Sequence, residues 1–127
     1  MISTIGAIAV GGALGAVMRH GVNVAAFKVF GDGFPWGTLG VNVIGSFAMG
    51  LLIAGFAHYG QPSPQMKMFL ITGLLGAFTT FSTFSLDVAV MWERGALMPA
   101  AAYVLGSLIL SVGALFLALA LIRSITS

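Results

Sequence analysis

Long apolar segments alternate with short polar segments along this chain. Charged residues are so few that four uncharged stretches remain, at 1–18, 33–66, 68–86 and 95–122. A helix needs about 20 mostly apolar residues to cross the hydrocarbon core of a bilayer, so each stretch can hold one span. The pattern therefore predicts four membrane-spanning helices.

Turn residues separate the predicted helices. The second uncharged stretch is too long for one span, but the run His58–Gln65 brings glycine, proline, serine and glutamine together and breaks it. Gly31–Pro35 and Trp92–Gly95 separate the other spans, with Trp36 and Trp92 placed as interface anchors. No Lys or Arg precedes Arg19, so the first span lacks the basic start of a signal peptide. We expect a single domain over residues 1–127 with helices at about 2–27, 36–58, 65–92 and 97–123.

The composition indicates an integral membrane protein. Of the 127 residues, 59% are hydrophobic and 6% charged, and the mean hydropathy is +1.09. Soluble domains carry about 25% charged residues, so the composition excludes a disordered tail, a nucleic-acid-binding protein and an ordinary cytosolic enzyme. The chain has no cysteine and only two histidines and three acidic residues, which leaves little for a metal cluster or a catalytic triad. We expect no enzymatic activity and no nucleic-acid partner.

The distribution of positive charge leaves the orientation in the membrane almost unbiased. Four spans place both termini on one side, together with Lys67 and Arg123. Lys28 and Arg94 lie on the other side, with Arg19 near it. Because an excess of Lys and Arg normally fixes the cytoplasmic side, two interpretations remain open. Either the chain takes a single orientation for another reason, or it inserts both ways and pairs as an antiparallel dual-topology homodimer. The small size of the subunit favours an oligomer.

Small residues indicate closely packed helices. Gly11, Gly12 and Gly15 include a Gly-xxx-Gly spacing in the first span. In lipid, such positions let helix backbones approach closely, and they give no information about a substrate.

Polar side chains at membrane depth are costly and are therefore the candidates for function. In the second span, Asn42 shares a helical face with Thr38, one turn before it. In the fourth span, Tyr103, Ser107 and Ser111 follow one another at steps of four and also share a face. Each set has a simpler explanation, because an amide can bond a neighbouring helix and a hydroxyl can bond the carbonyl four residues before it.

The third span contains an unusual run, Gly73–Ser85, with five hydroxyl residues and two glycines. Glycine and β-branched threonine weaken a helix, and Ser and Thr side chains offer the backbone other partners. We expect a break near Gly76–Thr80, where freed carbonyls can bind a cation and freed N–H groups favour an anion. The electropositive ring edges of Phe81 and Phe84 can line an anion path, although both rings can equally be ordinary packing residues.

The acidic residues lie outside the middle of every predicted span. Asp87 and Glu93 fall at the end of the third span and Asp32 in a connector. A proton-coupled or cation exporter of this size would need an intramembrane carboxylate, and the small multidrug-resistance transporters use a glutamate in their first span that this chain lacks. The donor-rich set of an amide, hydroxyls, ring edges and Arg19 instead suits a small, strongly hydrated anion that must also be able to leave.

Several segments of the chain together are similar to one known family. They are Gly11–Arg19, Gly37–Phe47 and Gly76–Ser85, with Tyr103 and the serines that follow it. In these segments, and over its whole length, the chain resembles the Fluc (CrcB) fluoride channels of bacteria. It departs from the family at Ala77, where a second glycine is common, and at His20, where an aromatic residue is common.

The resemblance implies an all-α integral membrane protein whose third helix is broken near its middle. It also implies an antiparallel dual-topology homodimer with two fluoride pathways in the bacterial inner membrane. Such a channel would let fluoride leave the cytoplasm passively and so confer fluoride resistance. Its partners would be fluoride, a second copy of the chain and the surrounding lipid.

The resemblance further assigns roles to individual residues. The fluoride pathway would be lined by Asn42, Phe81, Phe84, Ser82, Thr83, Tyr103, Ser107 and Ser111, with Thr38 on the Asn42 face. Arg19 would be the arginine of the vestibule. Backbone carbonyls of Gly76 and Thr79 from both subunits would hold a structural sodium ion at the dimer axis.

The alternative function belongs to another class of membrane protein. The chain can be a structural membrane subunit, or a small-solute exporter of the size of the small multidrug-resistance proteins. In that interpretation the polar residues hold neighbouring helices together and line no pathway.

Overall fold

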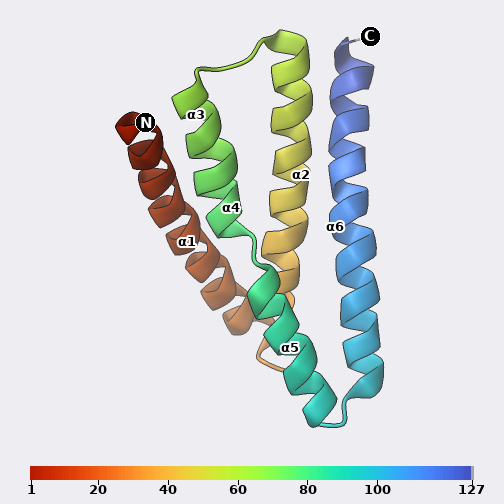
Figure 1. Cartoon of the computed structure of the whole chain (residues 1–127). Coiled ribbons are helices and arrows are strands. Elements are labelled where there is room, and N and C mark those ends of the chain that lie inside the picture. The colour runs from red at the N-terminus through yellow and green to blue at the C-terminus, as the bar shows by residue number, and fades with distance from the viewer. Residues whose placement is uncertain (127) are drawn as a thin grey trace.

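Helices joined by short connectors make up the computed structural model, which describes residues 1–126 (Figure 1). The first, second and last are α1 (Ile2–Phe30), α2 (Trp36–Tyr59) and α6 (Leu97–Thr126). The third span consists of α3 (Pro64–Met68), η1 (Phe69–Leu75), α4 (Gly76–Phe78) and α5 (Phe81–Glu93). Four helical lengths, Ile2–Phe30, Trp36–Tyr59, Pro64–Glu93 and Leu97–Thr126, are long and apolar enough to cross a membrane. The prediction of an all-α protein with four spans and a broken third helix is confirmed.

Local sequence signals explain where helices start and stop. Gly31 after α1 and Gly60 after α2 have φ of 77° and 115°, a backbone region that residues with a Cβ rarely adopt. Ser63 caps α3, since its hydroxyl oxygen accepts from the Met66 N–H at 3.1 Å, and Pro64 occupies the first turn. The connectors therefore fall where the turn residues predicted them.

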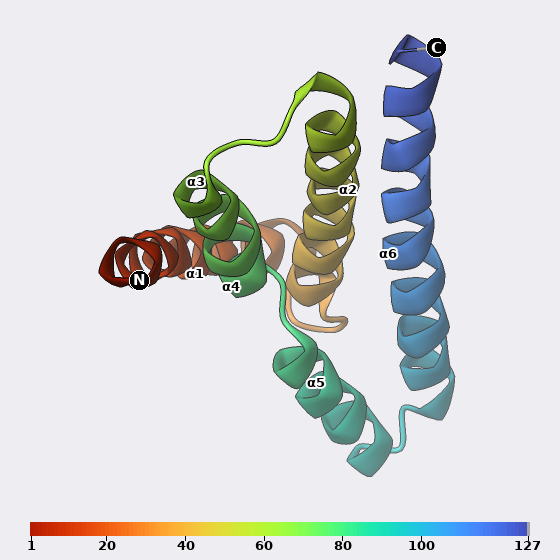
Figure 2. The same ribbon diagram turned by 45° about the horizontal axis from the view of Figure 1, so that its top comes forward.

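The spans form two closely packed pairs. α2 packs mainly against α6, whereas α1 packs mainly against η1 and α4. In Figure 1 both termini and the connector from α2 to α3 lie at one end, and the other connectors lie at the opposite end. Figure 2 shows that α1 is inclined away from the α2–α6 pair and that α5 reaches across toward α6. The arrangement leaves α4 and the start of α5 close to α2.

Glycines of α1 allow the close contact with the third span. A Cβ on Gly11 would overlap the carbonyl oxygen of Phe69, and one on Gly15 would overlap the carbonyl oxygen of Leu74. A Cβ on Gly12, in contrast, would have no other atom of the chain within 4 Å. The contacted segment η1 is a π-helix, a form that occurs mostly as short interruptions at functional sites and that the sequence pattern did not predict.

The break in the third span lies at Thr79 and Thr80. Their backbones are extended, with φ and ψ of −85° and 160° at Thr79 and of −153° and 124° at Thr80. Gly76, which we expected to begin the break, is helical, with φ −60° and ψ −37°. The break therefore falls later than the glycine suggested, because threonine side chains and a partner from α2 stabilise the extended residues.

Few side chains are buried within the chain. One small cluster of Met91, Ala100 and Tyr103 joins α5 to α6. Large apolar side chains elsewhere remain exposed, such as Val17 at 69% and Ile109 at 67%. A soluble protein would bury such residues away from water. Lipid tails are as apolar as these side chains, so exposing the side chains to lipid costs little free energy. The exposure therefore fits a helical protein embedded in a bilayer.

Candidate functional site

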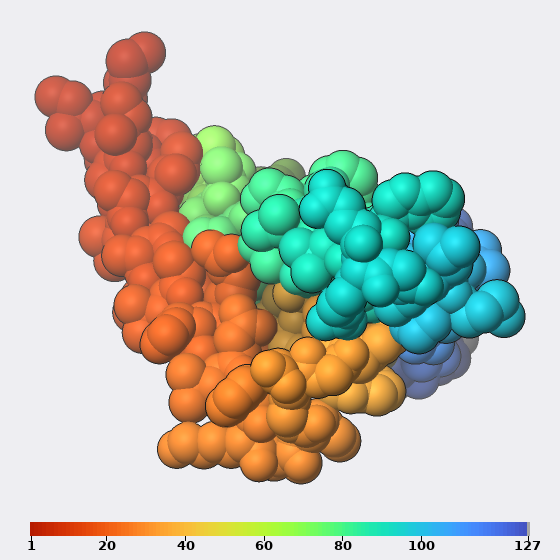
Figure 3. Space-filling model, turned by 90° about the horizontal axis from the view of Figure 1, so that it is seen from below, coloured from red at the N-terminus to blue at the C-terminus, as the bar shows by residue number. Residues whose placement is uncertain are grey.

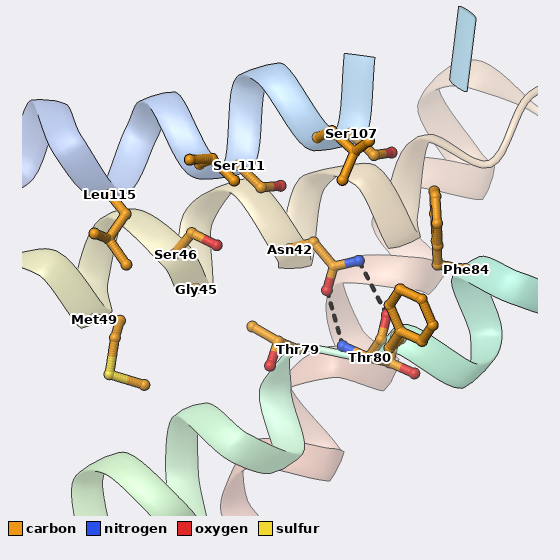
Figure 4. A pocket seen from close by; sticks show the side chains of 13 residues that line it. Asn42, Gly45, Ser46, Met49, Thr79, Thr80, Phe84, Ser107, Ser111 and Leu115 are labelled. Atoms are coloured by element: carbon orange, nitrogen blue, oxygen red, sulfur yellow. Dashed lines mark hydrogen bonds between the residues drawn. The ribbon is translucent and has the colours of Figure 1, made fainter. Parts of the chain in front are cut away.

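A cavity of about 300 Å³ lies between α2, α6 and the break in the third span (Figure 4). It brings together five predicted pathway residues from three helices, namely Asn42, Phe81, Phe84, Ser107 and Ser111. The other lining residues are Gly45, Ser46, Met49, Thr79, Thr80, Leu108, Val112 and Leu115. Helical spacing alone predicted the α2 and α6 rows, and the fold places the two rows against each other.

Asn42 is bound to the break by two hydrogen bonds, which are drawn in Figure 4. Its Nδ2 donates to the carbonyl oxygen of Thr80 at 3.0 Å, and the Thr80 N–H donates to its Oδ1 at 2.8 Å. The amide of Asn42 thus pairs with both backbone groups of one extended residue. One Nδ2 hydrogen is left over, because a side-chain amide has two donors.

Two serine hydroxyls of α6, those of Ser107 and Ser111, are buried without a partner among the described residues. Ser107 is 6% exposed, and the Oγ atoms of both Ser107 and Ser111 are buried and make no hydrogen bond among the described residues. The expected simpler explanation was a bond to the carbonyl one turn earlier, and the structure shows no such bond. A buried hydroxyl without a partner loses its water at a cost of about 1–3 kcal/mol, so two adjacent ones indicate a place for a polar ligand.

Aromatic rings border the same cavity. The ring centroids of Phe81 and Phe84 are 5.6 Å apart, and those of Phe84 and Tyr103 are 5.0 Å apart, both with tilted planes. Phe81 is 76% exposed, so its ring extends out of the subunit and does not serve as internal packing. Tilted rings present electropositive edges, which favour a nearby anion.

Tyr103 is fully buried and has a polar partner that the sequence analysis missed. Its hydroxyl donates to Oδ2 of Asp87 at 2.8 Å. Asp87 had been placed at the end of the third span without a role. The signal that could have revealed it is its position one helical turn after Thr83, which puts both side chains on one face of α5.

A second cavity, of about 340 Å³, opens at the end where α1 joins α2. Figure 3 views the molecule from this end, with α1 running from red to orange, the connector that follows it in orange and α5 in cyan. Two predicted residues, Thr38 and Thr83, line this cavity, as do Asn23, Asp87 and Arg94. The predicted set is therefore divided, with one part in the first cavity and another part in the second.

The remaining predicted residues occupy different surroundings. Thr80, Ser82 and Thr83 form a hydroxyl cluster, with Thr80 Oγ1 3.4 Å from Ser82 Oγ and 3.2 Å from Thr83 Oγ1. Thr80 also lines the first cavity and Thr83 the second, so the cluster connects the linings of the two cavities. Arg19 lines neither cavity, and its Nε is buried without a partner among the described residues.

Backbone oxygens at the break are candidate cation ligands, because acidic, histidine and cysteine side chains form no cluster in the described residues. No group of three or more His, Cys, Asp or Glu side chains gathers within residues 1–126. Within residues 1–126, no backbone N–H donates to the carbonyl of Gly76 or Thr79 apart from any bond inside a regular helix. Gly76 is also exposed. Free carbonyls at a helix break are the type of ligand that binds sodium in membrane proteins, so these two residues fit the expected role.

Comparison with known proteins gives one family. The family described as CrcB-like protein, Camphor Resistance (CrcB), matches residues 6–119. A protein of Rhodospirillum centenum named "Fluoride-specific ion channel FluC" is 56% identical over 118 residues, covering 93% of this chain and 94% of its own. Proteins of the same name from Chelativorans sp. and Agrobacterium fabrum are 56% and 50% identical over 118 and 121 residues. These alignments cover 93% and 95% of this chain, and 94% and 97% of the two relatives.

Proposed function

The chain belongs to the CrcB family, and from that premise we propose that it is a fluoride-selective ion channel. Its relatives are named as fluoride-specific ion channels. Fluoride would leave the cytoplasm passively, and the cell would thereby resist fluoride. No catalytic step is part of the proposal.

The observation that supports a pathway best is the pair of unpartnered hydroxyls in the first cavity. Ser107 and Ser111 remain buried and unbonded beside Asn42, which keeps one free amide hydrogen. Fluoride is small and strongly hydrated, so a pathway must replace its water by donors at each step. Two hydroxyl groups and an amide hydrogen on one wall supply such donors.

Aromatic edges complete the chemistry of this wall. Phe81 and Phe84 line the same cavity as the α6 serines, and their ring centroids are 5.6 Å apart. A ring edge attracts an anion weakly and carries no full charge. The combination lets the ion enter and also lets it leave, as conduction requires.

The hydroxyl cluster would continue the route toward the second cavity. Thr80, Ser82 and Thr83 lie one after another at the start of α5, and Thr83 lines the second cavity with Thr38. We assign the second cavity as one mouth of the pathway, and Arg19 as the vestibule arginine by the family resemblance. Tyr103, which is held by Asp87, would separate the two cavities.

A second copy of the chain would complete the site. Phe81 extends from the subunit with 76% of its surface exposed, so a wall of the first cavity is missing from one chain. The nearly equal Lys and Arg counts on the two sides support a partner of opposite orientation. The proposed unit is therefore an antiparallel dual-topology homodimer with two pathways, in the bacterial inner membrane.

A sodium ion would bind between the two subunits. Gly76 and Thr79 would contribute their carbonyl oxygens from each chain, and hard oxygen ligands suit a small alkali cation. When bound, the ion would hold the two broken helices together. Its role would be structural, because the donors that face fluoride lie on other residues.

Fluoride efflux from liposomes tests the proposed function against the structural-subunit alternative. Liposomes loaded with potassium fluoride and containing the purified chain should lose fluoride within seconds to minutes after valinomycin is added to let potassium leave as well, as measured with a fluoride electrode. Protein-free liposomes are the control and should retain fluoride. Equal retention by both preparations would favour a structural subunit, and the polar residues would then only connect helices.

A further inference from the structure

The break in the third span is stabilised from outside that span. α4 ends at Phe78 and α5 begins at Phe81, with Thr79 and Thr80 extended between them. Nothing in covalent geometry prevents Thr80 from being helical, since it lacks a proline neighbour. The extended conformation therefore depends on the hydrogen bonds that it makes.

Asn42 supplies two of those bonds. It accepts the Thr80 N–H at 2.8 Å and donates to the Thr80 carbonyl at 3.0 Å. In an α-helix the N–H of residue 80 would donate to the carbonyl of residue 76. Asn42 therefore takes the donor that Gly76 would otherwise have.

The carbonyl of Thr79 loses its donor in a similar way. Its helical donor would be the N–H of Thr83. That N–H donates to the hydroxyl oxygen of Thr80 at 3.2 Å, in the manner of a helix N-cap. The same extended residue, Thr80, thus accounts for both free carbonyls, and Asn42 holds that residue in place.

We infer that Asn42 is a positioning residue for the cation site, and not only a donor to fluoride. By binding Thr80, it keeps the carbonyl of Gly76 free for a cation at the subunit axis. Without it, Thr80 could become helical and its N–H would take its helical acceptor, the Gly76 carbonyl, so that one ligand from each subunit would be lost. The cation part of this inference rests on the proposed function, whereas the bonds of Asn42 do not.

The test measures sodium-dependent thermal stability of the full-length protein in detergent. A ligand that binds only the folded state raises the unfolding temperature, and the rise grows with the logarithm of the ligand concentration relative to its Kd. For the unaltered chain, sodium should raise the midpoint relative to N-methylglucamine at equal ionic strength. In Asn42→Leu, which has a similar volume and no polar group, about tenfold more sodium should be needed for the same rise in midpoint, which corresponds to about 1.4 kcal/mol of lost binding free energy.

Two further variants make the result specific. Ser46, one turn along α2 and in the same cavity, makes no hydrogen bond to Thr80 or to the free carbonyls, so Ser46→Ala should keep the sodium response of the unaltered chain. Asn42→Asp keeps the acceptor for the Thr80 N–H, so the sodium concentration needed for a given rise in midpoint should not increase, even though the variant loses the donor. If Asn42→Leu does not fold, Asn42→Asp still tests the inference.

Three results would contradict the inference. They are an unaltered sodium response in folded Asn42→Leu, an increase in the sodium requirement of Asn42→Asp as large as that expected for Asn42→Leu, and no sodium response in the unaltered chain. Fluoride flux is absent from this test. A chain with the expected sodium responses but no fluoride efflux would therefore contradict the proposed function and leave the positioning role of Asn42 standing.

Discussion

Two serines of α6 have buried hydroxyl groups that lack a hydrogen-bond partner among the described residues. The Oγ atoms of Ser107 and Ser111 are both buried and unbonded among the described residues. A protein that used these side chains only for packing would be more stable with alanine at either position. Their presence indicates that a bound ion or water supplies the missing partner.

At the residue scale we therefore predict opposite effects of Ser107→Ala on stability and on flux. The variant should be as stable as the unaltered protein or more stable by up to about 1 kcal/mol, because it removes an unsatisfied buried group. Its fluoride efflux should fall several-fold, because a donor is lost. Thermal unfolding in detergent and liposome efflux measure the two effects.

The matched control for this prediction is Ser124→Ala in the same helix. The Ser124 hydroxyl donates to the Leu121 carbonyl at 3.0 Å and is exposed. Its removal should leave the efflux rate unchanged. A loss of stability in Ser107→Ala with normal efflux would show that the hydroxyl is structural.

A second prediction concerns the ring at position 81. Phe81→Ile keeps an apolar side chain of similar exposure but removes the electropositive ring edge. Efflux should fall by about tenfold or more, which corresponds to about 1.4 kcal/mol in the barrier. Phe116→Ile is the control, since Phe116 is 63% exposed on α6 and lines neither cavity. Similar efflux rates in the two variants would argue against a role for the Phe81 ring.

Much of the site at this scale was predictable from the sequence. Residues such as Asn42, Ser107 and Ser111 are rare polar groups in apolar spans, and helical spacing alone puts them in rows. Spacing places Asp87 on the Thr83 face of α5, but it does not identify Tyr103 as the partner of Asp87, because that hydrogen bond joins two helices. The same applies to the Asn42–Thr80 pair, whose members are 38 residues apart.

At the scale of elements, the contact between α1 and η1 depends on two particular glycines. Gly11→Ala should destabilise the protein by about 1–3 kcal/mol, because the added Cβ would overlap the Phe69 carbonyl oxygen and force the helices apart. Gly12→Ala, whose Cβ would meet no atom of the chain, should have little effect or a small stabilising one. Thermal unfolding of both variants in detergent gives the comparison, and equal midpoints would contradict the packing described here.

The spans themselves followed from the sequence, whereas the details of the third one did not. Hydropathy and turn residues suffice to place four long helices, because a bilayer fixes their length. The position of the break was displaced from the glycine to Thr79 and Thr80, because hydrogen bonds from Asn42 decide the conformation there. The π-helix of η1 likewise adjoins a close contact with α1 that no local pattern encodes.

At the scale of the whole molecule, the proposed dual orientation predicts the effect of added positive charge. Tyr59→Lys with Gln61→Lys adds two charges at the exposed end of α2 and in the connector that follows it. By the positive-inside rule, all subunits should then insert with this connector in the cytoplasm. Antiparallel pairs would no longer form, and fluoride resistance of the cells should be lost. Growth on fluoride-containing medium measures the outcome.

The control for that prediction uses a second copy with the opposite bias. Adding two lysines near the α1–α2 connector, at Gly33 and Val29, should invert that copy, and co-expression of both should restore growth. Full resistance from the first biased chain alone would show that a single orientation is enough for function.

The central claim is that fluoride crosses the membrane passively through this protein, and voltage-driven efflux tests it most directly. Liposomes loaded with potassium fluoride are diluted into potassium-free solution. Valinomycin is then added so that potassium can leave and cancel the voltage that fluoride efflux builds up. Fluoride efflux should be slow before valinomycin and rapid after it, and liposomes loaded with potassium chloride should show no comparable chloride efflux. Rapid fluoride loss without valinomycin, equal chloride loss, or no loss after valinomycin would contradict a selective, electrogenic fluoride channel.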